Sequence, residues 1–388
     1  MRILTIHNKY KIRGGEDEAR ESEDKLLSSR GHVVEEFVLD NSVIGQENQL
    51  KVGFLATWNQ SAYDAVRQKI KAFRPNVVDV HNFFPLASPA VHHAAKSLGV
   101  AVAQTLHNYR LLCPGAIFFR DGHVCEDCTK HVLPWPGVVH GCYHGSALQT
   151  GAVALMVAAH RMLRTWRRAV SVFFISTEFG KRKFVENGFP ASKIVVKPNF
   201  ILDPGPQPAE RSGFLFAGRL TGDKGVNTLL GAMKHLGADI RLSIIGEGPL
   251  RPTVEAAASN DSRITYLGKL PQREVLRAMG AAKCVVVASE WYETFGRVAA
   301  EAFACGTPVI TSSIGALAEV VEDGRTGLHF PPGDAEGLAR AIDYINRNPN
   351  AVAAMQRAAR SEYESKYTPE RNYQLLLQAY AQAGAAIE

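Results

Sequence analysis

Short runs of apolar and β-branched residues recur along the chain, and stretches with apolar residues at helical spacing lie between them. Such runs predict strands buried on both faces, as in parallel sheets, and the helical stretches predict the crossovers that join them. The expected strands are Ile3–Ile6, Val77–Val80, Val100–Thr105, Val172–Ile175, Phe214–Ala217, Arg241–Ile245, Cys284–Ala288 and Pro308–Thr311. The pattern therefore predicts an α/β protein with two doubly wound, Rossmann-like sheets in series.

A proline-rich stretch, Pro198–Pro208, has neither a helical nor an alternating period and is typical of an interdomain linker. We therefore expect an N-terminal domain over residues 1–200 and a C-terminal domain over residues 201–368. After Pro369 a last helical pattern is followed by no strand, so residues 369–388 are expected to form a helix that packs back on the first domain. A length of 388 residues fits two domains, because single cores rarely grow beyond about 250–300 residues.

The composition is that of a globular protein, with 46% hydrophobic and 21% charged residues. A net charge of +6 is mild for this length, so nucleic acid is not an expected partner. The apolar run at Met1–His7 is too short for a signal peptide, and no stretch of about 20 residues is apolar throughout. These features predict a cytoplasmic protein without a membrane-spanning helix.

The expected strand Phe214–Ala217 leads into a loop that contains Gly218, Arg219, Lys224 and Gly225. Ligands bind at strand ends in open α/β sheets, and glycines let the backbone approach them closely. The guanidinium and the ammonium suit the oxygens of a diphosphate. A tight turn with two solvated cations is the alternative interpretation of this loop taken alone.

A second motif follows the strand Cys284–Ala288. Here Glu293 and Gly296 precede an expected helix over residues 297–305, and Glu301 lies within that helix. The start of a helix attracts anions, and each carboxylate can accept two hydroxyl donors, as from the diol of a ribose or a hexose. A solvated helix face explains Glu301 poorly, because its neighbours are apolar.

In the order and spacing of these motifs, the chain resembles the retaining GT-B glycosyltransferases of family four. The resemblance covers nearly the whole chain and implies two Rossmann-like domains that face a central cleft. It implies that Arg219 and Lys224 hold the donor diphosphate, that Glu301 binds the ribose, and that Glu293 contacts the sugar. The implied donor-binding set is Gly14, Gly15, Gly218, Arg219, Lys224, Gly246, Gly268, Leu270, Glu293, Thr294, Phe295, Gly296 and Glu301.

The same resemblance places His107, which follows the strand Val100–Thr105, beside the transferred sugar. Asn108 stands where the family commonly has an aspartate, so the role of the histidine carries over better than that of its neighbour. A hydrogen-bonded core histidine is the alternative interpretation. The implied catalytic residues are His107, Arg219, Lys224 and Glu293.

The implied reaction is transfer of a hexose-type sugar from a UDP- or GDP-linked donor with retention of the anomeric configuration. The leaving diphosphate, steadied by the two cations, helps to deprotonate the acceptor hydroxyl. No catalytic metal is expected. The alternatives are another GT-B enzyme, such as a sugar-nucleotide epimerase or a phosphorylase, and a non-catalytic nucleotide-sugar-binding partner of another transferase.

Four cysteines fall within one irregular insertion over residues 113–145: Cys113, Cys125, Cys128 and Cys142. Cys125 and Cys128 have the spacing of a zinc knuckle, so a structural zinc site is one interpretation, with free thiols or disulfides as alternatives. Four histidines could replace a cysteine ligand: His123, His131, His140 and His144. The remaining cysteines, Cys284 and Cys305, are expected in buried elements.

Residues 154–168 combine apolar residues, Trp166 among them, with four arginines and predict a basic amphipathic helix. Such a helix can lie on anionic lipid at the inner face of a membrane, so a peripheral membrane contact is one hypothesis. A core-packing helix with a solvated cationic face is the other. The acceptor is expected to be a glycan or a lipid-linked molecule, and the membrane hypothesis favours the second. Either acceptor fits bacterial polysaccharide or glycolipid synthesis.

Overall fold

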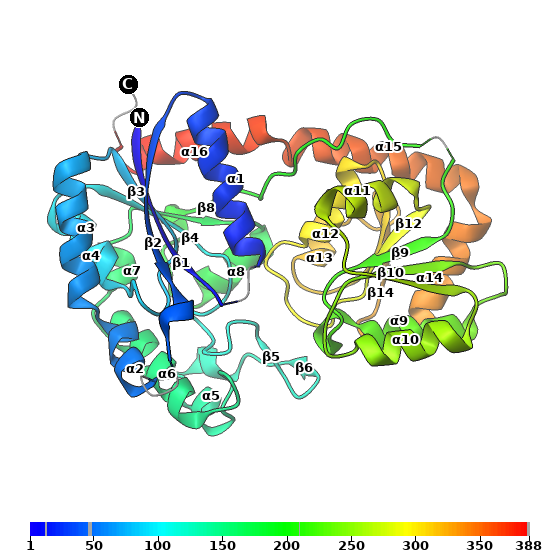
Figure 1. Ribbon diagram of the computed structural model, residues 1–388, viewed down its shortest axis with the longest axis horizontal. Helices are drawn as coiled ribbons and strands as arrows, with labels where there is room; N and C mark the ends of the chain where they lie inside the picture. The colour runs from blue at the N-terminus through cyan, green and yellow to red at the C-terminus, as the bar shows by residue number, and fades with distance from the viewer. Residues whose placement is uncertain (12–13, 46–48, 209, 386–388) are drawn as a thin grey trace. The chain divides into compact units, whose positions relative to one another are not determined.

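A computed structural model describes residues 1–11, 14–45, 49–208 and 210–385 (Figure 1). The chain forms two compact units. The first comprises Met1–Phe118, Cys125–Lys197 and Asn372–Glu388, and the second comprises Phe119–Val124 and Pro198–Arg371. Each unit is built around one parallel six-stranded sheet with helices on its faces, which confirms the predicted α/β class with two parallel sheets.

The sheet of the first unit has the strand order β2-β1-β3-β4-β7-β8. Its strands are β1 (Arg2–Lys9), β2 (Val33–Asp40), β3 (Val77–Asn82), β4 (Ala101–Thr105), β7 (Val172–Ile175) and β8 (Ile194–Val196). The direction of winding reverses between β1 and β3. At such a switch point the loops that follow the two strands diverge and leave a crevice at the carboxyl edge of the sheet, where ligands bind.

The first unit also contains helices. They are α1 (Gly15–Ser29), α2 (Gln49–Thr57), α3 (Gln60–Phe73), α4 (Ala90–Ser97), α5 (Trp135–Val139), α6 (Ala147–Met162), α7 (Thr165–Arg168), α8 (Glu178–Glu186) and α16 (Pro369–Gln382). The last helix, drawn in red in Figure 1, belongs to this unit because Leu376 and Tyr380 share a core with Ile3 and Val77. A short hairpin, β5 (Phe119–Arg120) and β6 (His123–Val124), lies within the cysteine-containing insertion.

The sheet of the second unit has the order β11-β10-β9-β12-β13-β14. Its strands are β9 (Phe214–Ala217), β10 (Leu242–Ile245), β11 (Ile264–Gly268), β12 (Cys284–Val287), β13 (Val309–Ser312) and β14 (Gly327–Phe330). Its helices are α9 (Val226–Ala232), α10 (Arg251–Asn260), α11 (Gln272–Ala281), α12 (Arg297–Ala304), α13 (Leu317–Val320), α14 (Ala335–Arg347) and α15 (Pro349–Lys366). The switch point of this sheet lies between β9 and β12, the two strands that precede the predicted phosphate-binding loops.

The side chains of the second sheet alternate between two cores. Phe214, Phe216 and Ile244 pack on one face, whereas Leu215 and Ile245 pack on the other. Because both faces are covered, the central strands are apolar throughout, which is the pattern that revealed them in the sequence.

The predicted continuous helix over residues 154–168 is wrong. Helix α6 ends at Met162, Arg164 takes a left-handed conformation with φ of 56°, and a separate short helix begins at Thr165. Trp166 is only 4% exposed and packs against the rings of Phe83 and His92, so it is a core residue rather than an interfacial one. Across the described part of the chain, no helix is both long and apolar enough to cross a bilayer.

Candidate functional site

Two loops meet at the switch point of the second sheet. The backbone N–H of Glu290, in the loop after β12, donates to the carbonyl of Asp223, in the loop after β9, at 2.8 Å. Thr228 Oγ1 donates to Glu290 Oε1 at 2.5 Å. Gly225 permits this approach, because it has φ of 68° and a Cβ there would lie 1.8 Å from the carbonyl oxygen of Ala288.

Lys224 and Glu293 form an ion pair across these two loops. Lys224 Nζ lies 2.6 Å from Glu293 Oε1, which also accepts from Ser289 Oγ at 2.5 Å, and the ammonium lies 5.1 Å from the ring centroid of Trp291. Burial raises the pKa of Glu293, but the charge of Lys224, the two hydrogen bonds and the charge of Arg219 outweigh it, and the pKa is lowered overall. The carboxylate is therefore ionised at neutral pH.

Arg219 lies at the open side of the same loop. Its side chain is 65% exposed and pairs with Asp223 at 3.3 Å. An exposed guanidinium at the end of a flexible side chain can turn toward a phosphate oxygen with little loss of packing. The structure therefore brings together the two cations that the sequence assigned to one diphosphate.

The second glutamate is held by a different set of partners. Glu301 is 5% exposed, and its Oε1 accepts from Gln272 Nε2 and from Arg297 Nε, both at 2.8 Å. Gly296, at the start of α12, has φ of 86°, and a Cβ there would lie 2.7 Å from Leu317 Cδ2. Phe295 beside it is buried in the core.

Further glycines link the ends of the neighbouring strands. The N–H of Gly246 donates to the carbonyl of Gly268 at 2.9 Å, and a Cβ on Gly246 would lie 1.8 Å from the carbonyl oxygen of Gly218. Leu270, after β11, packs against one of the two cores. These predicted donor-binding positions thus share one edge of the sheet with Lys224.

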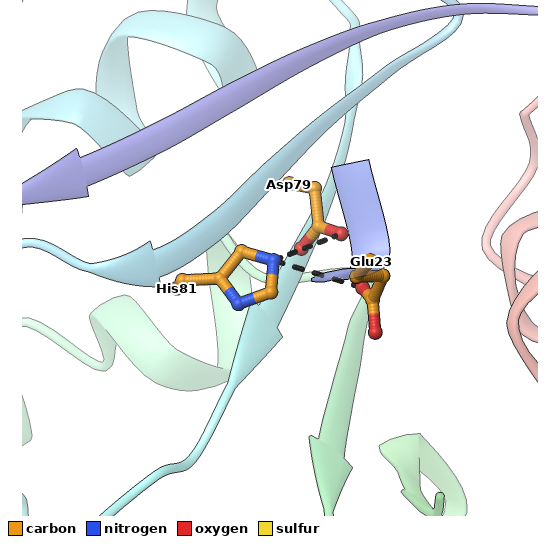
Figure 2. Close-up of side chains that lie close together, drawn as sticks. All are labelled: Glu23, Asp79 and His81. Atoms are coloured by element: carbon orange, nitrogen blue, oxygen red, sulfur yellow. Dashed lines mark ion pairs between the residues drawn. The ribbon is translucent and has the colours of Figure 1, made fainter. Parts of the chain in front are cut away.

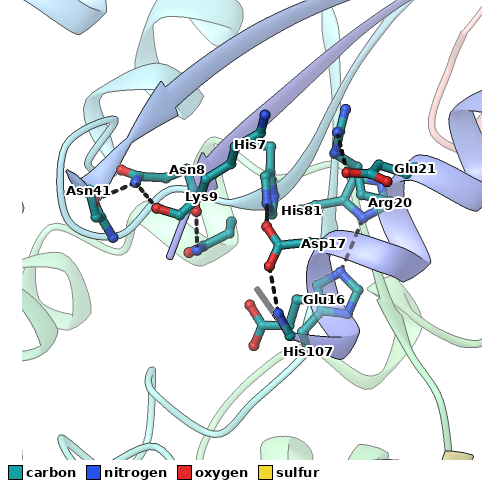
Figure 3. Close-up of polar contacts among 12 residues, drawn as sticks. His7, Asn8, Lys9, Glu16, Asp17, Arg20, Glu21, Asn41, His81 and His107 are labelled. Carbon is teal, nitrogen blue, oxygen red and sulfur yellow. Dashed lines mark hydrogen bonds and ion pairs between the residues drawn. The ribbon is translucent and has the colours of Figure 1, made fainter. Parts of the chain in front are cut away.

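In the first unit, His107 lies at the carboxyl edge of the sheet, where its Nε2 is 3.1 Å from Nδ1 of His81 (Figure 3). Asn108, where an aspartate was expected, donates to Glu16 Oε1 at 2.7 Å and so ties this loop to the start of α1. Gly14, the N-cap of that helix, donates to Asp17 Oδ2 at 2.9 Å. A Cβ at Gly14 or Gly15 would meet nothing within 4 Å, so packing alone does not require glycine at either position.

The four cysteines of the insertion lie in one region, because Cys113, Cys125 and Cys142 are all close enough to Cys128 to influence its pKa. The N–H of Gly137 donates to Cys128 Sγ at 3.2 Å. Burial, followed by the proximity of Cys113, raises the pKa of Cys128 to about 12. Among the described residues, one set of three ligand atoms lies within 4.8 Å of one another, and it contains none of these cysteines. The zinc site therefore stays a prediction.

That set of three is Glu23, Asp79 and His81, buried in the first unit (Figure 2). Glu23 pairs with the ammonium of Lys197, and Asp79 accepts from the hydroxyl of Tyr380. Because a lysine and a tyrosine hydroxyl already meet these carboxylates, the cluster fits a buried ionic network better than a metal centre.

The side chains that hold the site residues in place are not among the predicted ones. They are Ser289, Gln272 and Arg297 in the second unit, and Glu23, Asp79 and His81 in the first. One signal was present for His81, because it follows a predicted central strand on the same edge as His107. Asp79 lies within that predicted strand itself, and the others lie in helices or loops without a local motif.

Comparisons with known proteins agree with this architecture. Residues 201–362 match the family model of glycosyl transferases group 1. A glycogen synthase from Mycobacterium tuberculosis (strain CDC 1551 / Oshkosh) is 35% identical over 189 residues, which is 47% of this chain and 44% of that protein. A D-inositol 3-phosphate glycosyltransferase from Mycobacterium sp. (strain JLS) is 32% identical over 232 residues, covering 54% and 52%. The chain thus spans about half the length of these curated relatives.

The crystal structure of Anabaena HepE in complex with UDP is similar over 98% of this chain and 100% of that one, with a TM-score of 0.71 and 17% sequence identity. At that identity the likeness shows the fold. Residues 201–362 are therefore similar to the glycosyl transferases group 1, and the two sheets have the GT-B fold.

Proposed function

We propose that this protein is a retaining glycosyltransferase that moves a hexose-type sugar from a nucleotide-diphosphate sugar to an acceptor. The observation that carries the proposal is the Lys224–Glu293 pair at the switch point of the second sheet, with Arg219 beside it. This arrangement offers two cations to a diphosphate and an ionised carboxylate to sugar hydroxyls. The UDP in Anabaena HepE supports a nucleotide donor, without deciding here between UDP and GDP.

In this mechanism the ammonium of Lys224, which pairs with Glu293 in the structure, pairs instead with the donor diphosphate. A diphosphate carries more charge than one carboxylate, so Lys224 moves to it and frees Glu293 Oε1 for a sugar hydroxyl. Arg219 and Lys224 then stabilise the charge that grows on the leaving diphosphate, whose oxygen takes the proton of the acceptor hydroxyl. Glu301, fixed by Gln272 and Arg297, accepts from the hydroxyls of the nucleotide ribose.

Calorimetric titration with UDP, GDP and their hexose conjugates tests the donor site. We expect one nucleotide to bind, and Arg219→Ala and Lys224→Ala each to weaken its binding by about 1.5 kcal/mol or more, as for loss of a charge-assisted hydrogen bond. Arg340→Ala is the matched control, because this exposed cation of α14 pairs with Asp334 and Glu336 at the start of its own helix. The proposal is contradicted if the folded protein binds no nucleotide. It is also contradicted if Arg340→Ala weakens nucleotide binding as much as Arg219→Ala and Lys224→Ala do.

Product analysis separates transfer from the alternatives. A retaining transferase forms a glycoside with the anomeric configuration of the donor, which NMR of the product shows. An epimerase would isomerise the donor without any acceptor, and a phosphorylase would cleave a glycoside with inorganic phosphate. A non-catalytic binding partner would bind the donor but neither transfer nor slowly hydrolyse it.

For the acceptor, we propose an amphipathic, lipid-linked glycan. The first unit contains a cavity of about 470 Å³ whose wall includes Val52, Ala56 and Val153. One side of it carries Arg110, whose guanidinium lies 4.4 Å and 5.1 Å from the ring centroids of Phe84 and Tyr143. An apolar wall beside a cation suits a chain with an anionic head group. We infer that the enzyme acts in polysaccharide or glycolipid synthesis, at the cytoplasmic face of a bacterial membrane.

We also propose that the cysteine insertion holds structural zinc. Thiols from four points of an irregular segment lie in one region, and the Gly137 N–H to sulfur contact is of the kind that supports a bound thiolate. Elemental analysis of protein purified without chelator tests this, with about one zinc per chain expected and its loss in Cys128→Ser. Zinc-free protein of unchanged stability would contradict it, and Cys284→Ser, in a buried strand, is the control.

A further inference from the structure

Two histidines meet at the carboxyl edge of the first sheet. His81 belongs to β3 and His107 follows β4, and their rings stack with centroids 5.3 Å apart. Both line a cavity of about 30 Å³, which has room for an ordered water. Phe84 and Arg110 line both this cavity and the larger one of the first unit, so the histidine pair stands directly beside the proposed acceptor space.

Behind His81 lie two buried carboxylates (Figure 2). His81 Nε2 is 3.6 Å from Glu23 Oε1 and 3.7 Å from Asp79 Oδ2. These distances are long for hydrogen bonds, and burial, followed by the charge of Glu23, raises the pKa of Asp79 to about 7. In this buried site the carboxylate of Glu23 therefore favours the ring proton on the nitrogen that faces it. The proton of a neutral His81 is therefore on Nε2, and its Nδ1 is an acceptor.

Both rings are neutral in the folded protein. Burial, followed by the charge of Lys197, holds the pKa of His81 well below its usual value. Burial, followed by His81 itself, does the same for the pKa of His107. The carboxylates do not need a charged imidazole, because Lys197 pairs with Glu23 and Tyr380 donates to Asp79.

A single hydrogen bond joins the two rings at 3.1 Å, and only one of the two nitrogens can carry its proton. Since His81 Nδ1 accepts, His107 Nε2 donates. His107 Nδ1 then bears a lone pair rather than a proton.

We propose that His81 is a positioning residue, which holds His107 in the Nε2–H tautomer so that His107 Nδ1 accepts a hydrogen bond from a ligand hydroxyl. Glu23 and Asp79 orient His81 in turn. The part played by this tautomer in sugar transfer rests on the proposed function. The tautomer itself does not.

Long-range ¹H–¹⁵N NMR of the full chain, labelled at histidine, distinguishes protonated from bare ring nitrogens without any substrate. We expect wild-type His81 and His107 both to carry their proton on Nε2 at pH 7. In His81→Leu, His107 should lose this single tautomer, whereas His81→Asn should keep it, because the carboxamide oxygen offers an acceptor near the position of Nδ1. A proton on His107 Nδ1 in the wild type, or an unchanged tautomer in His81→Leu, overturns the proposal.

Kinetics then test the consequence. We expect His81→Leu to lower kcat about tenfold, the effect of one lost hydrogen bond, with His81→Asn recovering most of the rate. Nucleotide binding, measured by calorimetry, should be the same in both variants, because Arg219, Lys224 and Glu301, the side chains proposed to hold the nucleotide, lie in the second unit. Equal kcat losses in the two variants would overturn the positioning role. Absence of transfer by the wild type would contradict the proposed function and leave the tautomer result standing.

Discussion

At the scale of single residues, the proposed donor site depends on glycines at which a side chain has no room. Gly225 and Gly222 belong to the same turn, yet their surroundings differ. Gly225 has φ of 68°, and a Cβ there would lie 1.8 Å from the carbonyl oxygen of Ala288, whereas a Cβ on Gly222 would meet nothing within 4 Å. The turn therefore contains one glycine that the packing requires and one that it does not.

We predict that Gly225→Ala lowers the free energy of unfolding by about 2 kcal/mol or more, from left-handed strain and the contact with Ala288. It should also weaken nucleotide binding, because the shifted loop carries Lys224. Urea denaturation and calorimetry measure the two effects. Gly222→Ala is the control and should change both little. Similar losses in the two variants would show that the turn tolerates neither change and that the local contact is not the cause.

At the scale of elements, the strands found in the sequence are the central strands of each sheet, and those missed are the edges. β2 and β8 border the first sheet, and β11 and β14 border the second. Central strands are covered on both faces and read as apolar runs, while edge strands are covered less. β2, for example, carries Glu35, Glu36 and Asp40 among its apolar residues. Local hydrophobicity therefore predicts the middle of such a sheet better than its borders.

The attachment of α16 to the first unit shows how one polar contact adds to an apolar helix face. Tyr380 is fully buried, and its hydroxyl donates to Asp79. We predict that Tyr380→Phe lowers the free energy of unfolding by about 1.5–3 kcal/mol, since it leaves a buried carboxylate without a donor. Tyr373→Phe, on the same helix, loses only a partly buried contact with His32 and should cost less. Urea denaturation compares them, and equal costs would contradict this role of Asp79.

At the scale of the whole molecule, a surface of the first unit combines exposed apolar and basic side chains. Arg161 donates to the carbonyls of His131 and Val132, which places Val132 (62% exposed) beside the end of α6, where Met162 is 69% and Leu163 56% exposed. Three exposed arginines follow: Arg164, Arg167 and Arg168. This surface replaces the amphipathic helix of the sequence hypothesis and suits an anionic membrane.

We predict that the protein co-floats with vesicles containing anionic phospholipid and much less with neutral ones. A double variant, Met162→Ser with Leu163→Ser, should reduce binding about tenfold or more, because burial of each apolar side chain contributes about 1.5–3 kcal/mol. Leu267→Ser, at an exposed apolar side chain of the second unit, is the control. If the wild-type protein binds neither kind of vesicle, the membrane proposal is wrong.

The sequence by itself determined the α/β class, the central strands and the loops that carry Arg219, Lys224 and Glu293, because these features are local: an apolar run or a motif at a strand end is complete within a few residues. Only the tertiary structure decided which side chains hold them. Ser289 and Lys224 share one oxygen of Glu293, Gln272 reaches Glu301, and His81 meets His107 across two strands. Packing between segments that are distant along the chain brings such partners together, and the spacing of residues in the sequence does not predict it.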